Sequence, residues 1–568
     1  MKKLKQLLCL LLALAMVFAL ASCGNSSSPA PSGDSTNAAA PSDDAPAAEP
    51  GNAASEAATN VAEGVTTTVN DVGAVTIQTP ASDAFTRKTA EGTLTVGTMT
   101  NAAGNLDPAL TEGPGCFAVF DQLFGVDRDG NIVGELVESW QYLDEENTQL
   151  ELKLHEGVKF SNGEELTAED VLYSLDRFDD VGSSYTYWAG IDFDQSYAAD
   201  DYTVVLVTPT TNVSLISYMA TFRGSVVCKS WAESASDEDW WDSAVGSGPY
   251  LCTENTSGSQ SVFTARDDYW QGTPEFSTIT IKYYTEQTTM MVDYQNGVID
   301  VCYDLSASNI ARVRNGEVSN STLVLDPNPM TWTILIAQKK ADSPMTNDLF
   351  RKAFVEALDM EGLGIAVADD LFSVADSVIT AASHMETTDH FEHVYDPEQA
   401  KADLEASGYK PGEVTLTVTI EGGAGYKEIA EAVQAYEAEI GIKVEIYEAD
   451  IPTLIGNLMA GADDFCFNKL ADQIGDPDNY YDFLADYSTA LQCSYSDPTF
   501  NENSLKARTI ADRAERAELY SAAWQSVYDQ YYVVPAFNVY FGCLSRDYIK
   551  DATMPNYNYI DVVRITAE

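Results

Sequence analysis

The stretch Lys153–Phe178, KLHEGVKFSNGEELTAEDVLYSLDRF, decides the fold of this 568-residue chain. Apolar and polar residues alternate at its start, which predicts a half-buried strand that turns at Gly157. Asn162 and Gly163 both tolerate positive φ, so this dipeptide predicts a tight hairpin turn. Thr167 then occupies the N-cap position of a helix whose apolar residues recur at helical spacing. The stretch therefore predicts a strand, a turn and a capped amphipathic helix, all of them scaffold.

In this order of turn, cap and helix, the stretch resembles a characteristic segment of the bacterial extracellular solute-binding proteins of family 5. These are the peptide, dipeptide and nickel receptors of ABC importers. Further motifs of that family follow in the expected order, and the resemblance covers the chain from about Gly92 to Val563. The matching motifs are GELVESW (134–140), GSGPY (246–250), RDDYWQG (266–272), YDPEQAK (395–401) and IGIKVE (440–445).

The resemblance implies an α/β fold, a two-lobe periplasmic-binding-protein-like clamp of type II, cluster C-like, with an extra small subdomain in the first lobe. Strands that alternate with helices after residue 414 agree with a mixed α/β second lobe. The expected boundaries are 87–330 for the first lobe, with the subdomain at about 136–220, then 331–505 for the second lobe and 506–568 for the return to the first.

The chain begins with a targeting segment rather than a fold element. Lysines at positions 2, 3 and 5 precede an apolar run that is too short to span a bilayer as a stable anchor. The run ends in LASC at 20–23, which resembles a lipoprotein lipobox, so we expect a signal peptide at 1–22 and a lipid on Cys23. Residues 23–86 then form an acidic Ala/Ser/Pro-rich tether, which we expect to be disordered because it holds too little apolar surface. A Val/Thr-rich patch at 65–77 leaves one added strand open.

The formal net charge is -57, from 88 acidic and 31 basic residues. Such a chain is not expected to bind nucleic acid or anionic lipid headgroups through its own charge. An acidic, well-solvated surface that keeps an exported protein soluble explains the charge.

The predicted ligand-binding stretch is FCFNKLADQIGDPDNYYDFL, residues 465–484. In the peptide-binding members that the chain resembles, an aspartate before a DPDN turn pairs with the α-amino group of the ligand, and the matching residue is Asp472. A carboxylate that faces a buried ammonium gains a charge-assisted hydrogen bond. A structural role as a cap or loop carboxylate is the alternative for Asp472.

Two features depart from the family pattern in this stretch. The family usually has a Trp two or three residues before the aspartate, where this chain has Lys469 and Leu470, and one extra residue precedes the Asp-Pro turn. Lys469 either faces solvent or receives an anionic group of the ligand. The other residues expected to contact the ligand are Leu470, Trp332, Asn105 and Tyr480.

Three of the four histidines, His384, His390 and His393, lie among carboxylates within HMETTDHFEH. Histidine and carboxylate together can bind a divalent metal such as nickel or zinc. The segment falls where the family has a surface loop, so a solvated acidic loop is the alternative interpretation.

No catalytic set is visible, because G-x-S-x-G, H-E-x-x-H and C-x-x-C are all absent. No cofactor and no enzymatic activity are expected. Seven cysteines remain after Cys9 in the leader and Cys23, and their odd number and wide scatter argue against a disulfide framework.

The resemblance implies a substrate-binding lipoprotein of an ABC importer, anchored by lipid at the extracytoplasmic face of the cell membrane. It captures an oligopeptide or dipeptide by hinge closure and delivers it to the permease and ATPase subunits. We expect a monomer with no nucleic-acid partner. A nickel or metallophore receptor on the same fold is the alternative.

Overall fold

The computed structural model describes residues 61–552 and 561–567, except 63, 70–73, 81–91, 100–105, 111–114, 128–130, 182–189, 304, 338–339, 381–382, 384, 423–424, 473 and 485–496. All of these residues lie in one compact unit that spans residues 49–568. Cys23, Asn105 and His384 fall outside the described residues, and so does the predicted signal peptide.

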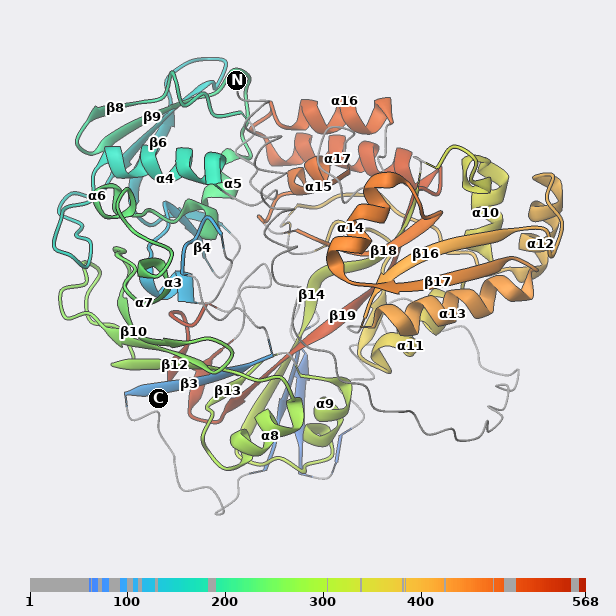
Figure 1. Cartoon of the computed structure of the whole chain (residues 1–568), viewed down its shortest axis with the longest axis horizontal. Coiled ribbons are helices and arrows are strands. Elements are labelled where there is room, and N and C mark those ends of the chain that lie inside the picture. Colours follow the sequence, from blue (N-terminus) through green and yellow to red (C-terminus); the bar gives the residue numbers. More distant parts are fainter. Residues whose placement is uncertain are drawn as a thin grey trace. The chain divides into compact units, whose positions relative to one another are not determined.

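In the part of the chain that the structure describes, one mixed sheet of eleven strands runs through the fold (Figure 1). Nine strands follow one another along the sheet, while β15 (Phe372–Val374) pairs with β19 and β18 (Phe465–Ala471) pairs with β14. The nine, in spatial order, are β1 (Thr66–Val69), β2 (Val75–Gln78), β14 (Ser321–Ile336), β19 (Val533–Arg546), β13 (Val301–Cys302), β3 (Thr93–Thr98), β12 (Thr278–Tyr283), β11 (Gln260–Ala265) and β10 (Tyr250–Thr256).

The long antiparallel strands β14 and β19 connect the elements drawn in blue and green with those drawn in orange (Figure 1). Their pairing is interrupted twice, between Pro327 and Thr331 and again between Trp332 and Thr333. Before the first interruption β14 also pairs with β2, and after it β14 also pairs with β18. These strands therefore change partners at an irregular stretch in their middle.

The stretch Lys153–Phe178 has the predicted structure. Strand β7 (Gln149–Leu154) leads into turns at Gly157 and Gly163, both with positive φ, and then into helix α4 (Ala168–Val181). The Asp170 carboxylate accepts hydrogen bonds of 2.9 Å from both the backbone N–H and the hydroxyl of Thr167, which completes the predicted cap. The helix packs on a four-stranded sheet of β6 (Val137–Tyr142), β7, β9 (Thr203–Val207) and β8 (Tyr197–Asp200).

A second α/β region is built around two parallel strands, β16 (Thr415–Glu421) and β17 (Lys443–Ala449). Asp396, which is followed by Pro397, has the sequence of a typical N-cap, and its carboxylate accepts a 2.9 Å hydrogen bond from the Gln399 N–H in helix α12 (Pro397–Ala406). Helices of this region and of the segment that follows it are α10 (Asp348–Glu356), α11 (Met360–Ala368), α12 (Pro397–Ala406), α13 (Tyr426–Glu439), α14 (Ile451–Ala460), α15 (Asp478–Leu484), α16 (Pro498–Ala507) and α17 (Arg513–Tyr528).

Short elements complete the described chain. They are α3 (Gly115–Val119), β4 (Phe124–Val126), β5 (Ile132–Gly134), α5 (Leu215–Met219), η1 (Phe222–Gly224), α6 (Lys229–Ala232), α7 (Asp239–Asp242), α8 (Gln287–Gln295), α9 (Ala307–Arg314), η2 (Pro344–Thr346), β20 (Ile549–Asp551) and β21 (Thr566–Ala567).

The expectation of a disordered tether up to residue 86 is wrong for the stretch that contains β1 and β2. Strand β2 pairs with β14 from Val75 opposite Leu325 to Gln78 opposite Thr322, and Val75 and Ile77 are fully buried. The Val/Thr-rich composition left one added strand open here, and the structure has two. The stretch is ordered because β2 pairs with a strand far along the chain and buries two apolar side chains.

Both ends of the main sheet are irregular or short. Strand β1 pairs only with β2 among the described strands and has four residues, three of them exposed. Strand β10, at the other end, holds an extra residue at Thr253 between the positions that pair with Val262 and Phe263. This β-bulge twists the end strand locally.

We predict that Ile77→Ala destabilises the folded chain by about 2–4 kcal/mol, because it removes a buried side chain and leaves a cavity beside Leu323. Val69→Ala in β1 is the matched control, since Val69 is 48% exposed and its truncation is expected to change the free energy of unfolding by less than about 0.5 kcal/mol. Urea unfolding of the two variants measures the difference. Equal midpoints would show that β2 is not part of the cooperative fold.

Candidate functional site

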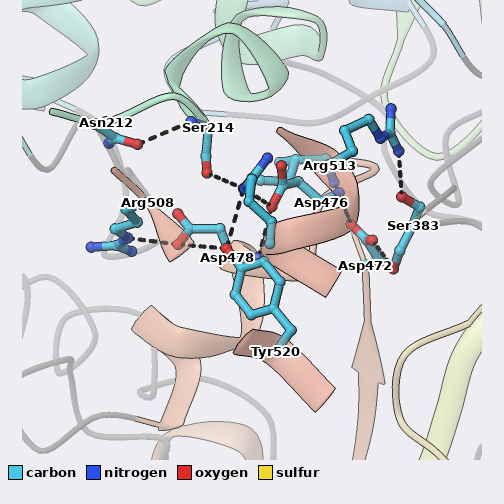
Figure 2. A network of polar contacts seen from close by, with 11 residues as sticks. Asn212, Ser214, Ser383, Asp472, Asp476, Asp478, Arg508, Arg513 and Tyr520 are labelled. Atoms are coloured by element: carbon cyan, nitrogen blue, oxygen red, sulfur yellow. Dashed lines mark hydrogen bonds and ion pairs between the residues drawn. The ribbon is translucent and has the colours of Figure 1, made fainter. Parts of the chain in front are cut away.

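Asp472 lies immediately after β18, in the turn that precedes α15 (Figure 2). Its Oδ1 accepts hydrogen bonds from the backbone N–H groups of Ile474 (3.0 Å) and Asp476 (3.1 Å), and its Oδ2 accepts one from the Ser383 hydroxyl. The Asp472 side chain is fully buried. Burial raises the pKa of this carboxyl to about 6, because the loss of water outweighs the three hydrogen bonds.

Among the residues that the structure describes, no Lys, Arg or His nitrogen forms an ion pair with Asp472. The Arg513 guanidinium donates to the backbone oxygen of Ser383 (3.1 Å), the residue whose hydroxyl donates to Asp472 (Figure 2). Asp472 therefore combines full burial with neutral donors only, which is a site suited to a positively charged ligand group.

The next two aspartates of the turn are paired with arginines. Asp476 accepts a 2.7 Å hydrogen bond from Arg516, and Asp478 accepts one of 2.6 Å from Arg508. Arg516 also donates to the Ser214 hydroxyl (2.8 Å), so the guanidinium joins helix α17 to the start of α5 (Figure 2). Arg516 was not predicted to belong to the site. Nothing in the sequence of its helix indicates that its partner Ser214 lies 302 residues earlier in the chain.

A backbone contact supports the same connection. The Val213 N–H donates to the Arg508 carbonyl oxygen at 2.9 Å. Together, the contacts of residues 213–214 with Arg508 and Arg516 link the region of α5 to the elements that carry the aspartate-rich turn.

Lys469 and Trp332, both expected to contact the ligand, lie side by side. They are direct partners across the β14–β18 pair, and the Lys469 ammonium lies 4.4 Å from the centroid of the Trp332 ring. Tyr426, at the start of α13, forms the other side of this group, with its ring centroid 4.9 Å from the ammonium. Sequence reasoning missed Tyr426, whose only local signal is its place after a Gly-rich loop.

Leu470 and Tyr480 occupy core positions. Leu470 points to the sheet face opposite to Lys469 and is buried opposite Thr331. The Tyr480 hydroxyl donates to the Val378 carbonyl oxygen at 2.9 Å, while its ring packs edge-on against Trp524. Both residues therefore pack in the core beneath β18 and the turn that follows it.

The two described histidines of the HMETTDHFEH segment make local contacts. His390 Nδ1 lies 3.1 Å from a carboxylate oxygen of Asp376, and His393 Nε2 lies 2.7 Å from the Ala375 carbonyl oxygen. Burial lowers the pKa of His393. Within the described residues, no group of three or more His, Cys, Asp or Glu side chains is arranged to hold a metal ion.

Six of these seven cysteines lie in the described part of the chain, and no disulfide joins any two of them there. They are Cys116, Cys228, Cys252, Cys302, Cys466 and Cys543.

Comparison with known proteins identifies the family of the chain. Residues 131–491 match the profile described as "Bacterial extracellular solute-binding proteins, family 5 Middle". The dipeptide-binding protein of Escherichia coli (strain K12) is 23% identical over 430 residues, which are 70% of this chain and 79% of that protein. The nickel-binding protein NikA of Staphylococcus aureus (strain NCTC 8325 / PS 47) is 23% identical over 61% of this chain and 68% of its own length.

The crystal structure of the dipeptide-binding protein from Pseudoalteromonas sp. SM9913, in complex with Met-Leu, superposes with a TM-score of 0.72. It is 19% identical, and the match covers 84% of this chain and all of that one. This likeness confirms the predicted α/β fold of a two-lobe binding-protein clamp.

We predict that Arg516→Met destabilises the protein by about 3 kcal/mol or more, because it leaves the buried Asp476 carboxylate without its counter-charge. Arg312→Met is the matched control, since the Arg312–Glu317 pair is exposed and is expected to contribute less than about 1 kcal/mol. Chemical unfolding of both variants gives the comparison, and similar losses in the two would argue against a compensated buried pair at Asp476.

Proposed function

Because the chain belongs to the bacterial extracellular solute-binding proteins of family 5, we propose that it captures short peptides for an ABC importer. The family consists of extracytoplasmic transport receptors rather than enzymes. Relatives named as dipeptide-binding and nickel-binding proteins support a role as a solute receptor. That the solute is a peptide is our proposal.

The observation that carries the proposal is the Asp472 carboxylate. It is fully buried, it accepts three hydrogen bonds from neutral donors, and it has no cationic partner among the described residues. The α-ammonium of a peptide supplies the charge that this group lacks, at a place where water does not compete. His390 and His393, by contrast, are engaged with Asp376 and Ala375, which gives the nickel alternative no support of its own.

Capture proceeds by closure of the two lobes, with 87–330 and 506–568 on one side and 331–505 on the other. The ligand shifts the population toward the closed form because it binds that form better. The contacts of Arg516 support this mechanism, since its guanidinium donates both to Ser214, on the first side, and to Asp476, on the second.

The receptor is held at the outer face of the membrane by a lipid on Cys23 after removal of residues 1–22, and it passes its ligand to permease and ATPase subunits. The LASC sequence at 20–23 supports this anchoring. In the part of the chain described by the structure, no helix has the length and apolar character needed to cross a membrane.

We predict that Asp472→Asn weakens binding of peptides with a free amino terminus by about 10- to 100-fold, the loss expected for one hydrogen bond to a charged group. The measurement is isothermal titration calorimetry of residues 24–568 with a peptide library, after native mass spectrometry has identified the bound peptides. Asp463→Asn, at the opposite end of β18, is the matched control, because Asp463 is also buried and also accepts a hydrogen bond from a hydroxyl, that of Thr419.

Three outcomes separate the proposals. Peptides that survive Asp472→Asn with unchanged affinity would keep the receptor class and remove the role of Asp472. A metal adduct in place of peptides would favour the nickel or metallophore alternative. No bound solute from a peptide-rich medium would contradict peptide capture.

Peptide affinity is also expected to fall as the pH is lowered from 7 to 5. With a pKa of about 6 in the ligand-free protein, the Asp472 carboxyl is mostly ionised at pH 7 and about one-tenth ionised at pH 5, whereas the peptide ammonium stays charged throughout. The Asp472 carboxyl has to lose its proton when the peptide binds, so the affinity at pH 5 is expected to be about tenfold lower than at pH 7. The same titrations in Asp472→Asn are expected to be flat, and a tenfold drop there would assign the pH dependence to another group.

A further inference from the structure

Ile474, in the turn that follows Asp472, is buried in the core of a distant part of the chain. Among the described residues, the other buried members of its hydrophobic cluster all lie between Ala109 and Cys228. They include side chains of β4, β6, β7, β9, α4 and α5, so this 109–228 cluster is the core of the predicted subdomain and of the segments next to it. The Ile474 side chain therefore crosses from the ligand-binding turn into the first lobe.

The neighbours of Ile474 in the sequence pack elsewhere. Leu470 and Tyr480 are buried in a different cluster, which also contains the apolar side chains of β16 and β17. Between these two residues the chain leaves one core and enters another. The burial of Ile474 is thus a property of the turn itself and does not follow from the packing of β18 or α15.

The turn has the length and the backbone conformation for this excursion. It holds one residue more than the family pattern between Asp472 and the Asp-Pro pair, and Gly475 has a φ of 68°. Glycine adopts this left-handed conformation without the steric cost that other residues have. The longer turn can therefore bulge outward and carry the Ile474 side chain away from its neighbours.

Ile474 also holds the carboxylate of the proposed ligand site. Its backbone N–H donates to Asp472 Oδ1 at 3.0 Å, beside the 3.1 Å hydrogen bond from the Asp476 N–H. One residue thus contacts the 109–228 cluster through its side chain and Asp472 through its backbone. If the side chain left the cluster, the donor would move away from the carboxylate.

Two polar contacts accompany this apolar one. The Ser214 hydroxyl accepts a 2.8 Å hydrogen bond from Arg516, and the Val213 N–H donates to the Arg508 carbonyl oxygen at 2.9 Å. The two arginines are the partners of the other two aspartates of the turn. Adjacent residues of the first lobe therefore contact both groups that fix the turn.

We propose that Ile474 is a positioning residue for peptide binding. Its side chain packs the turn into the 109–228 cluster, and its N–H then keeps Asp472 in the geometry that receives the ligand. The inference rests on the proposed function, because it concerns the same carboxylate. It gives the subdomain a role in binding without any contact to the peptide. Since only protein groups take part, the packing of Ile474 changes the affinity for every peptide by the same factor.

The first test is a calorimetric titration of residues 24–568 with trialanine and with trileucine, or with two peptides of the library if these bind too weakly. Ile474→Ala is expected to lower the affinity for both peptides by about 10- to 100-fold, because the packed turn loses a buried side chain. Ile474→Val is expected to restore most of the affinity and to leave a loss of about two- to tenfold. Loss factors that differ between the two peptides would indicate direct contact with the ligand and would overturn the proposal.

Leu175→Ala is the matched control. Leu175 is a buried member of the same cluster, but it lies in α4 rather than in the turn. The control is expected to lower the midpoint of urea unfolding and to leave both affinities unchanged. A purely structural role for Ile474 predicts the same result for Ile474→Ala, namely lower stability at wild-type affinity, and that outcome would also overturn the proposal.

Hydrogen exchange of the unmodified protein gives a second test that does not depend on folding of the variants. At a peptide concentration of about 100 Kd, exchange of the Val213 amide is expected to slow by about tenfold or more, because separation of the turn from the first lobe then requires release of the peptide. Unchanged exchange at Val213 in the peptide-bound protein would overturn the role of Ile474 and leave peptide capture intact. Failure to bind either tripeptide, or any peptide of the library, would instead contradict the proposed function itself.

Discussion

A carboxylate removed from water needs hydrogen-bond donors or a counter-charge, and the turn after β18 has to satisfy three of them within seven residues. Asp476 and Asp478 are paired with Arg516 and Arg508, while Asp472 receives only neutral donors. The two ion pairs fix the turn, so the backbone N–H groups that donate to Asp472 are in position before a ligand binds. The hydrogen-bonding geometry around Asp472 is thus set by the protein itself, and in the proposed function the ligand would supply the positive charge.

The two long strands β14 and β19 place this turn relative to the rest of the fold. The part of β14 that pairs with β18 begins at Met330, within the irregular stretch between Pro327 and Thr331. Lys469, Trp332 and Asp472 consequently lie close to the point where the strands change partners. In the proposed closure, a small rotation about that stretch would move the site and the α5 region relative to each other and leave both halves of the sheet paired.

Local features were predictable from sequence, and distant contacts were not. The caps at Thr167 and Asp396 depend on residues three positions away, so they could be identified before the structure was known. The Asp472 turn was found through its resemblance to a family motif. Two features depend instead on residues brought together by the sheet: the pairing of β2 with β14 and the meeting of Lys469 with Tyr426. No pattern within either segment indicates its partner.

The ends of the main sheet decide how easily one molecule can pair with another. An open strand edge invites the strands of another molecule, and both ends here are poor templates for that. Strand β1 offers only four residues, and the bulge at Thr253 breaks the regular spacing of donors and acceptors along β10. The amino-terminal hairpin, which composition alone would assign to the tether, also covers the edge of β14. A chain that begins at residue 87 would uncover the edge of β14 from Thr322 to Leu325 and is expected to self-associate through it.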